Sequence, residues 1–344
     1  MQTKLTSKAP LLRDDGTLTS AGYATEPVLA YNRKAIHASK LRVKEWDYYY
    51  IGNERNGIAL TIADNGYMGL LSISAIDFIN PSEQTTSMMS IMPLGKMNLP
   101  ASATSGNVTV NNKRADFSFY NDGTARRLIC GMKNFKDGAD FFAEFTLSDP
   151  PDETMVIATP FAEKKTAFYY NQKINCMRAE GYARIGEKRI EFSKADTFGT
   201  LDWGRGVWTY NNTWYWGSAS GLVGNKKFGF NIGYGFGDTS NASENMVFYE
   251  NRAHKLEQVT FHIPRNEKGE YEYLKPWKFT SSDGRFEMDF VPILDRHADM
   301  NLLFLASFQH QVFGRFTGTA VLDDGTPIRI ENFLGFAERV TNRW

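Results

Sequence analysis

Residues 57–76 read GIALTIADNGYMGLLSISAI, and this passage sets the pattern for most of the chain. Two runs rich in apolar residues flank Asp64-Asn65-Gly66, where Asn and Gly accept the positive φ values that a tight turn requires. Such runs on either side of a short turn are typical of paired antiparallel strands. The passage therefore predicts a β-hairpin.

The same arrangement recurs along the chain. In residues 115–120 and 285–290 apolar side chains alternate with polar ones, as expected of strands with one buried face. Helical periodicity is absent after residue 44, which argues against alternating strands and helices. The sequence therefore predicts an all-β protein of antiparallel strands. Further turns of the same kind are Asn121-Asp122-Gly123, Lys136-Asp137-Gly138, Gly186-Glu187-Lys188, Ser282-Asp283-Gly284 and Asp323-Asp324-Gly325.

About sixteen to eighteen strands are expected, which is more than one small barrel takes, and closing a sheet on itself removes its exposed edges. We therefore predict two tandem β-barrels packed together, over residues 45–195 and 196–344, because an irregular Gly- and Trp-rich passage begins near the division. Pro150-Pro151 is a second candidate boundary. Residues 1–44 form a short leader, irregular or helical, in which 28–44 is the best helix candidate.

The chain has 344 residues, with 39 basic and 39 acidic side chains. This balance argues against a partner recognised by positive charge, such as a nucleic acid or an anionic membrane. Cys130 and Cys176 cannot build a disulfide framework, which favours a reducing compartment. No run approaches the ~18 apolar residues of a membrane span, and residues 1–25 lack the apolar core of an export signal. We expect a soluble, cytoplasmic protein without membrane insertion.

Trp residues gather beside charged side chains in the middle of the chain. Residues 202–208 read DWGRGVW, and Trp216 follows shortly afterwards. The glycines on both sides of Arg205 permit a sharp backbone turn, so an acid, a cation and indole rings can converge on one point. Asp202 is then a candidate acid, because burial raises the pKa of a carboxyl. The alternative is an Asp202–Arg205 ion pair, stacked on Trp, that only closes one end of a barrel.

A second polar cluster follows an aromatic run at residues 229–236. The Gly-x-Gly-x-Gly pattern in this run does not indicate a nucleotide site, because that motif requires a following helix and the alternation here predicts a strand. Asp238, Glu244 and Asn245 come just after the run, where we expect the mouth of a barrel.

His310 stands between Gln309 and Gln311 in an otherwise apolar strand. The two amides therefore share one face and the imidazole lies on the other. If the amides face inward they line a polar cavity, and if His310 does so it is a candidate proton carrier, although a structural His is also common. The spacing of the five His residues indicates no metal site, and no Gly-x-Ser-x-Gly motif indicates a serine hydrolase.

Several motifs closely resemble a microbial family of unknown function, DUF 2804, over nearly the whole chain from about Glu26. That family is in turn distantly similar to the lipocalin-like group that contains carotenoid hydratase, tocopherol cyclase and some fungal Diels–Alder cyclases. The resemblance implies two calycin-type barrels, an apolar ligand cavity and cofactor-free chemistry on alkenes. The motifs that carry it are residues 202–208, 216–221, 229–240, 276–277, 310–314 and 335–344.

Two functions follow as hypotheses. The first is a cofactor-free hydratase, isomerase or cyclase for isoprenoid- or polyketide-like alkenes, with Asp202 or Glu244 as the acid. Arg205 and His310 would then position water or a substrate oxygen. The second is a carrier for a hydrophobic small molecule, and a third reading is an interaction module whose Trp residues are only core. The oligomeric state stays open. The candidate ligand-binding residues are Trp203, Trp208, Trp216, Tyr234, Phe236, Asp238, Asn245 and Gln311.

Overall fold

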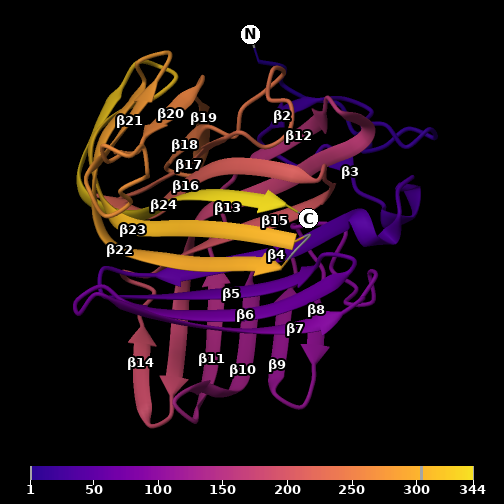
Figure 1. Ribbon diagram of the computed structural model, residues 1–344. Coiled ribbons are helices and arrows are strands. Elements are labelled where there is room, and N and C mark those ends of the chain that lie inside the picture. The colour runs from indigo at the N-terminus through magenta and orange to yellow at the C-terminus, as the bar shows by residue number, and fades with distance from the viewer. Residues whose placement is uncertain (1, 303–304, 344) are drawn as a thin grey trace.

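Strands make up nearly all of the secondary structure in the computed structural model, which describes residues 2–302 and 305–343 (Figure 1). They form two large antiparallel sheets and one short parallel pair, β1 (Ala9–Pro10) with β3 (Leu29–Ala30). The all-β prediction is confirmed.

The first sheet contains 13 strands among the described residues. Three of them lie off its main path: β12 and β14 pair with β13, and β2 pairs with β12. The bounds of these three are β2 (Gly22–Ala24), β12 (Met155–Phe161) and β14 (Lys188–Phe192). The main path runs in the spatial order β7 (Ser82–Ile91), β6 (Met68–Asp77), β5 (Asn56–Asp64), β4 (Val43–Gly52), β15 (Phe198–Val207), β13 (Lys164–Ile185), β11 (Ala139–Ser148), β10 (Arg126–Lys136), β9 (Ala115–Asn121) and β8 (Val108–Asn111).

The second sheet contains nine strands in the described part of the chain. Their spatial order is β19 (Arg252–Lys255), β18 (Met246–Tyr249), β17 (Lys226–Tyr234), β16 (Asn211–Val223), β24 (Pro327–Arg343), β23 (Leu305–Val321), β22 (Phe286–Leu302), β21 (Trp277–Ser281) and β20 (Val259–His262).

The hairpin predicted at residues 57–76 is present as β5 and β6. Ala63 pairs with Leu70 across the turn. The carboxylate of Asp64 accepts a hydrogen bond of 3.0 Å from the N–H of Gly66, whose φ is +79°. The turn therefore uses the left-handed backbone conformation that glycine adopts without strain.

The leader holds two single-turn 3₁₀ helices, η1 (Arg33–Ala35) and η2 (Lys40–Arg42), in place of the α-helix expected over residues 28–44. The side chains of Asn32 and Ser39 each cap one of them by accepting a backbone N–H. Neither turn buries a side chain, so no apolar face favours extending it into an α-helix. The helix prediction for this segment is wrong, and the leader is irregular apart from its short strands β1, β2 and β3.

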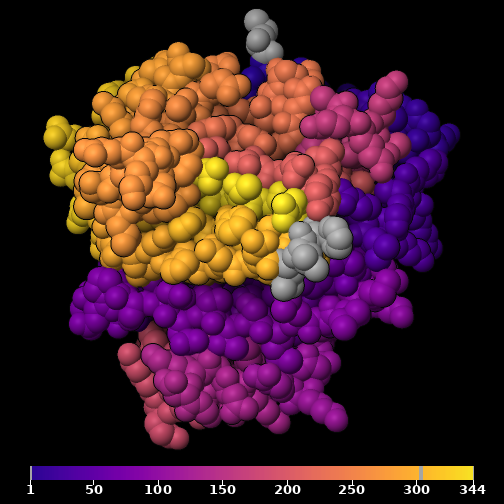
Figure 2. Space-filling model, viewed as in Figure 1, coloured from indigo at the N-terminus to yellow at the C-terminus, as the bar shows by residue number. Residues whose placement is uncertain are grey.

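Three groups of buried apolar side chains hold the structure together. The first lies mainly within the first sheet and its leader and extends to Met246 and Phe248 of β18, a second lies within the second sheet, and a third joins the two sheets. The third group includes Tyr48 of β4 with Phe313 of β23 and Phe336 of β24. In Figure 2 the orange and yellow part of the chain, which includes β22–β24, lies directly against the purple part, which includes β5–β7. The sheets are therefore packed tightly together, as expected.

The chain passes from the first sheet to the second through residues 208–210, between β15 and β16. The division expected between residues 195 and 196 falls just before β15, which pairs with β4 and β13 of the first sheet. The partners of β15 come from distant parts of the chain, so local composition does not reveal them. That the two sheets act as separate domains stays a prediction.

Candidate functional site

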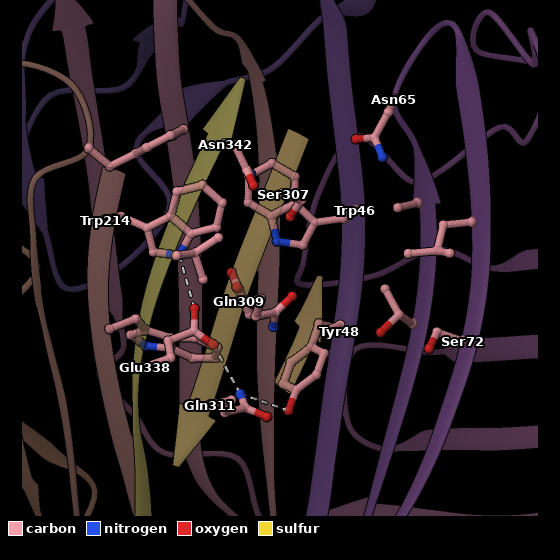
Figure 3. A pocket seen from close by; sticks show the side chains of 18 of the residues that line it. Trp46, Tyr48, Asn65, Ser72, Trp214, Ser307, Gln309, Gln311, Glu338 and Asn342 are labelled. Atoms are coloured by element: carbon pink, nitrogen blue, oxygen red, sulfur yellow. Dashed lines mark hydrogen bonds between the residues drawn. The ribbon is translucent and has the colours of Figure 1, made fainter. Parts of the chain in front are cut away.

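A cavity of about 310 Å³ lies between the two sheets (Figure 3). Side chains of β4–β7, β13 and β15 line it from the first sheet, and side chains of β16 and β22–β24 line it from the second. Its aromatic lining includes Trp46, Trp208, Trp214 and Phe236, and its polar lining includes amides and carboxylates. Both sheets are thus needed to form it.

Strand β15 separates this cavity from the core of the first sheet. Successive side chains of a strand point to opposite faces, so Asp202 lines the cavity whereas Trp203 and Arg205 do not. A Cβ at Gly204 would lie 1.9 Å from the ring of Trp46, so only glycine lets this indole approach the strand. The sequence of β15 thus fixes both the carboxylate and one ring of the cavity.

Lys173 of β13 joins two carboxylates beside the cavity. Its Nζ lies 2.9 Å from Asp202 Oδ1, 3.8 Å from Glu244 Oε2 and 4.2 Å from the centroid of the Trp216 ring. Asn171 also donates to Asp202, at 2.6 Å. Burial raises the pKa of Glu244, and the charge of Lys173 opposes that rise. One ammonium group therefore neutralises only one of the two carboxylates when both are ionised.

Glu338 of β24 is a second acid in the cavity lining (Figure 3). Its carboxyl oxygens accept hydrogen bonds from Trp214 Nε1 at 2.9 Å and from Gln311 Nε2 at 3.1 Å. Gln311 also donates to the hydroxyl of Tyr48 at 3.5 Å and accepts a hydrogen bond from Arg296. Burial raises the pKa of Glu338 to about 7. This group therefore gains and loses a proton near neutral pH.

Aromatic rings pack mostly edge to face along the cavity. The ring of Trp208 lies 4.7 Å from Phe236, 5.3 Å from Trp46 and 5.9 Å from Trp214, measured between centroids. Tyr169 stacks on Trp46 at 6.1 Å. Aromatic faces attract positive charge when water is excluded. The lining is therefore suited to an apolar ligand and to positive charge that develops on it.

Six of the twelve candidate catalytic and ligand-binding residues line this cavity. Of the two orientations left open for residues 309–311, the structure has the one in which Gln309 and Gln311 face the cavity. The six residues are Asp202, Trp208, Trp216, Phe236, Glu244 and Gln311.

Six other candidates lie outside the cavity lining. His310 is on the opposite face of β23 from the two amides, 2.7 Å from Asp295 Oδ2 and stacked on Tyr273 at 3.8 Å between centroids. Asn245 holds backbone, since its amide accepts from the N–H of Gly233 at 2.7 Å. Strand alternation thus turns His310 away from the cavity, and the hydrogen bond to Gly233 holds Asn245 outside its lining. The six are Trp203, Arg205, Tyr234, Asp238, Asn245 and His310.

Arg205 belongs to a buried hydrogen-bonded network on the face of β15 that points away from the cavity. Its guanidinium donates to three backbone carbonyls at 2.7 to 2.8 Å and to Asp47 Oδ1 at 2.9 Å. It also lies 4.2 Å from the centroid of the Trp203 ring. The partner of Arg205 is thus Asp47 rather than Asp202, because Asp202 points to the other face of the strand.

Lys173 and Glu338 line the cavity although the sequence did not mark them as site residues. Alternation carries a signal for Glu338, because it shares a strand face with Phe336 and Val340, both of which are buried. Lys173 has no such signal, since its partner Asp202 lies on a strand that is distant in the chain. Only the pairing of β13 with β15 brings the two together.

The fold and the cavity define a tandem lipocalin-like protein. The chain belongs to the family described as a domain of unknown function, DUF2804, whose model matches residues 2–344. The family and the fold expected from the sequence motifs are therefore confirmed. No curated protein matches the sequence.

Solved structures with low sequence identity share this fold. A candidate AttH of Nitrosomonas europaea is 12% identical, with a TM-score of 0.56 over 92% of this chain and 98% of its own. Kievitone hydratase of Nectria haematococca is 10% identical, with a TM-score of 0.53 over 98% of each chain. CghA bound to Sch210972 is also 10% identical, with a TM-score of 0.52 over 88% of each chain.

Two further features concern only residues 2–302 and 305–343. No helix there is long and apolar enough to cross a membrane. No three His, Cys, Asp or Glu side chains within these ranges are grouped as metal ligands.

Proposed function

We propose that this protein binds a neutral, largely apolar molecule between its sheets and protonates a carbon–carbon double bond without a cofactor. Isoprenoid- and polyketide-like alkenes are the substrate class, and the outcome is hydration, isomerisation or cyclisation. The observation that carries the proposal is Glu338, a buried carboxyl with a pKa raised to about 7 within an aromatic cavity.

Glu338 suits the role of acid because a proton donor works best when its pKa lies near the working pH. Hydrogen bonds from Trp214 and Gln311 hold its carboxyl in place. Its proton forms the new C–H bond with the π electrons of the alkene, which leaves a carbocation. The indole faces along the cavity would stabilise this cation by roughly 0.5–2 kcal/mol each.

Asp202 and Glu244 suit the second half of the reaction. In a hydration, water adds to the cation and passes a proton to one of these carboxylates; in an isomerisation, the carboxylate removes a proton from a neighbouring carbon. The Nζ of Lys173 lies 2.9 Å from Asp202 and 3.8 Å from Glu244, close enough to hold these two carboxyl groups in position. These are the two carboxylates that the sequence favoured as the acid, and here they act as the base.

Deuterium incorporation tests the proposal. The protein is incubated in D₂O with farnesol and with a prenylated phenol, and new C–D bonds are detected by mass spectrometry. We expect Glu338→Gln to slow incorporation by about 100-fold or more, since general acids contribute at least that much. The rate in the wild type should fall as pH rises above 7, because Glu338 then loses its proton.

Glu331→Gln is the matched control, because Glu331 is exposed on the same strand and does not line the cavity. Its rate should equal that of the wild type. An unchanged rate in Glu338→Gln, or no C–D bond with either alkene, would contradict the proposed chemistry.

A carrier of an apolar ligand is the second candidate function. It is favoured by the hydrogen bonds of Glu338, because each carboxyl oxygen already has a partner within the protein. Organic extracts of the purified protein distinguish the two functions. An unmodified lipid recovered in near-stoichiometric amount, without deuterium exchange, favours the carrier.

A further inference from the structure

Asn342 of β24 carries a buried amide without a partner. Its Oδ1 and Nδ2 form no hydrogen bond within the described part of the chain, although the residue is only 2% exposed. Its side chain lines the cavity between the sheets (Figure 3). Nearly all buried polar groups in proteins have a hydrogen-bonding partner. A ligand in the cavity is therefore the natural partner of this amide.

The described residues next to Asn342 form no hydrogen bond with its amide. Ser307 of β23 and Asn212 of β16 are its cross-strand neighbours, and both are uncharged. The amide of Asn212 instead donates to the carbonyl of Thr209 at 2.8 Å. Asn342 also borders a second hollow, of about 470 Å³, at the ends of the same strands. The lining of this hollow includes the charged residue Arg343, but the two side chains directly beside Asn342 are neutral. Neutral neighbours favour an uncharged ligand group over an ion at the amide itself.

Asn342 lies at a fixed separation from the proposed acid. Glu338, Val340 and Asn342 all line the cavity from one face of β24. At about 3.3 Å per residue, Glu338 and Asn342 are about 13 Å apart along the strand. Gln309 and Gln311 of β23 accompany this row. The acid and the unpartnered amide thus stand at two ends of one wall.

We propose that Asn342 anchors a carboxamide or lactam group of the ligand, at a position about 13 Å along β24 from Glu338. An Asn side chain offers one carbonyl acceptor and two N–H donors. A second amide is complementary to both and leaves neither atom of Asn342 unpaired. The substrate class is then an elongated apolar alkene with a neutral amide at one end. This inference rests on the proposed function only for the alkene end of the ligand, which Glu338 would protonate.

Binding of two matched probes tests the anchor. Farnesamide, the primary amide of farnesoic acid, is compared with farnesene, a hydrocarbon of the same size, by quenching of Trp fluorescence. The wild type should bind farnesamide about tenfold more tightly than farnesene. Asn342→Leu should lose this preference while it still binds farnesene. Asn80→Leu, a change at an exposed residue outside the cavity, should keep the preference.

The outcomes separate the anchor from the proposed function. If both probes bind and Asn342→Leu keeps the preference of the wild type, the anchor is overturned and the proposed function stands. If neither probe binds, the proposed function fails, and thermal unfolding of the free protein then decides the role of Asn342. Asn342→Leu should raise Tm by about 2–4 °C, because it removes an unpaired buried amide. A lowered Tm would mean that the amide is bonded within the protein, which also overturns the anchor.

Discussion

Two buried clusters of charge lie on opposite faces of strand β15. On one face Arg205 pairs with Asp47, and on the other Lys173 pairs with Asp202, each at 2.9 Å. Each cation also lies 4.2 Å from the centroid of an indole ring. By residue type, burial and distance the two clusters are closely similar.

They differ in what surrounds them. Backbone carbonyls enclose the guanidinium of Arg205, whereas Lys173 borders a cavity and is shared by two carboxylates. Buried charges beside Trp are therefore not evidence of chemistry by themselves. Access from a cavity, together with a second carboxyl group that shares the same cation, distinguishes the candidate site from a structural ion pair.

The largest effect on the free energy of unfolding is expected when the ion pair of Arg205 and Asp47 is broken. Arg205→Met should lower the free energy of unfolding by about 3–5 kcal/mol, because it leaves the carboxylate of Asp47 buried without its cation. Burial already raises the pKa of Asp47, and Arg205 opposes that rise. Urea unfolding measures the loss. The double variant Arg205→Met with Asp47→Leu should recover part of it, and a loss below about 1 kcal/mol in the single variant would refute this role.

The pH dependence of stability should reveal the buried acid Glu338 in the cavity lining. The pKa of Glu338 is raised from 4.5 to about 7 by burial, so the folded protein holds a proton that the unfolded chain releases in this range. Stability therefore falls as pH rises from 4.5 to 7, by about 3–4 kcal/mol in total at about 1.4 kcal/mol per pKa unit. Unfolding of wild type and Glu338→Gln at pH 4 and pH 8 isolates this contribution. Equal pH dependence in both proteins would exclude it.

Removing Lys173 from its cluster beside the cavity should lower the free energy of unfolding by less than removing Arg205 from its ion pair with Asp47. Lys173→Met should lower the free energy of unfolding by about 2 kcal/mol, since water in the cavity can solvate the carboxylates that remain. The pKa of Glu244 should rise further, because the charge of Lys173 now opposes its rise. Urea unfolding and titration of Glu244 by NMR test both points. A loss equal to that of Arg205→Met would mean that the two clusters are alike.

Local patterns in the sequence predict the strands of this fold well and its site only in part. The hairpin at residues 57–76 depends on neighbouring residues, and so does the placement of Gln311 and His310 on opposite faces of one strand. Alternation left open which of these two faces lies inward, and the structure shows that it is the face of Gln311. The pairing of Arg205 with Asp47 depends on β4 lying beside β15, and these strands are far apart in the chain. Alternation separates Asp202 from Arg205, yet it cannot name the partner of either. The site is formed by long-range strand pairing, which composition and spacing do not encode.

The smallest effect is expected at Asp238, a sequence-predicted site residue that belongs to neither cluster. Its carboxylate accepts a hydrogen bond of 3.0 Å from the N–H of Ser240, and this bond lowers the pKa of Asp238. Asp238→Asn keeps an acceptor oxygen in the turn, so the free energy of unfolding should change by less than about 0.5 kcal/mol. Affinity for farnesene should also stay unchanged, because Asp238 does not line the cavity. A clear loss of affinity in Asp238→Asn would show that ligands reach beyond the cavity between the sheets. Contact with that cavity would then no longer distinguish charged side chains that bind ligand from those that form structural ion pairs.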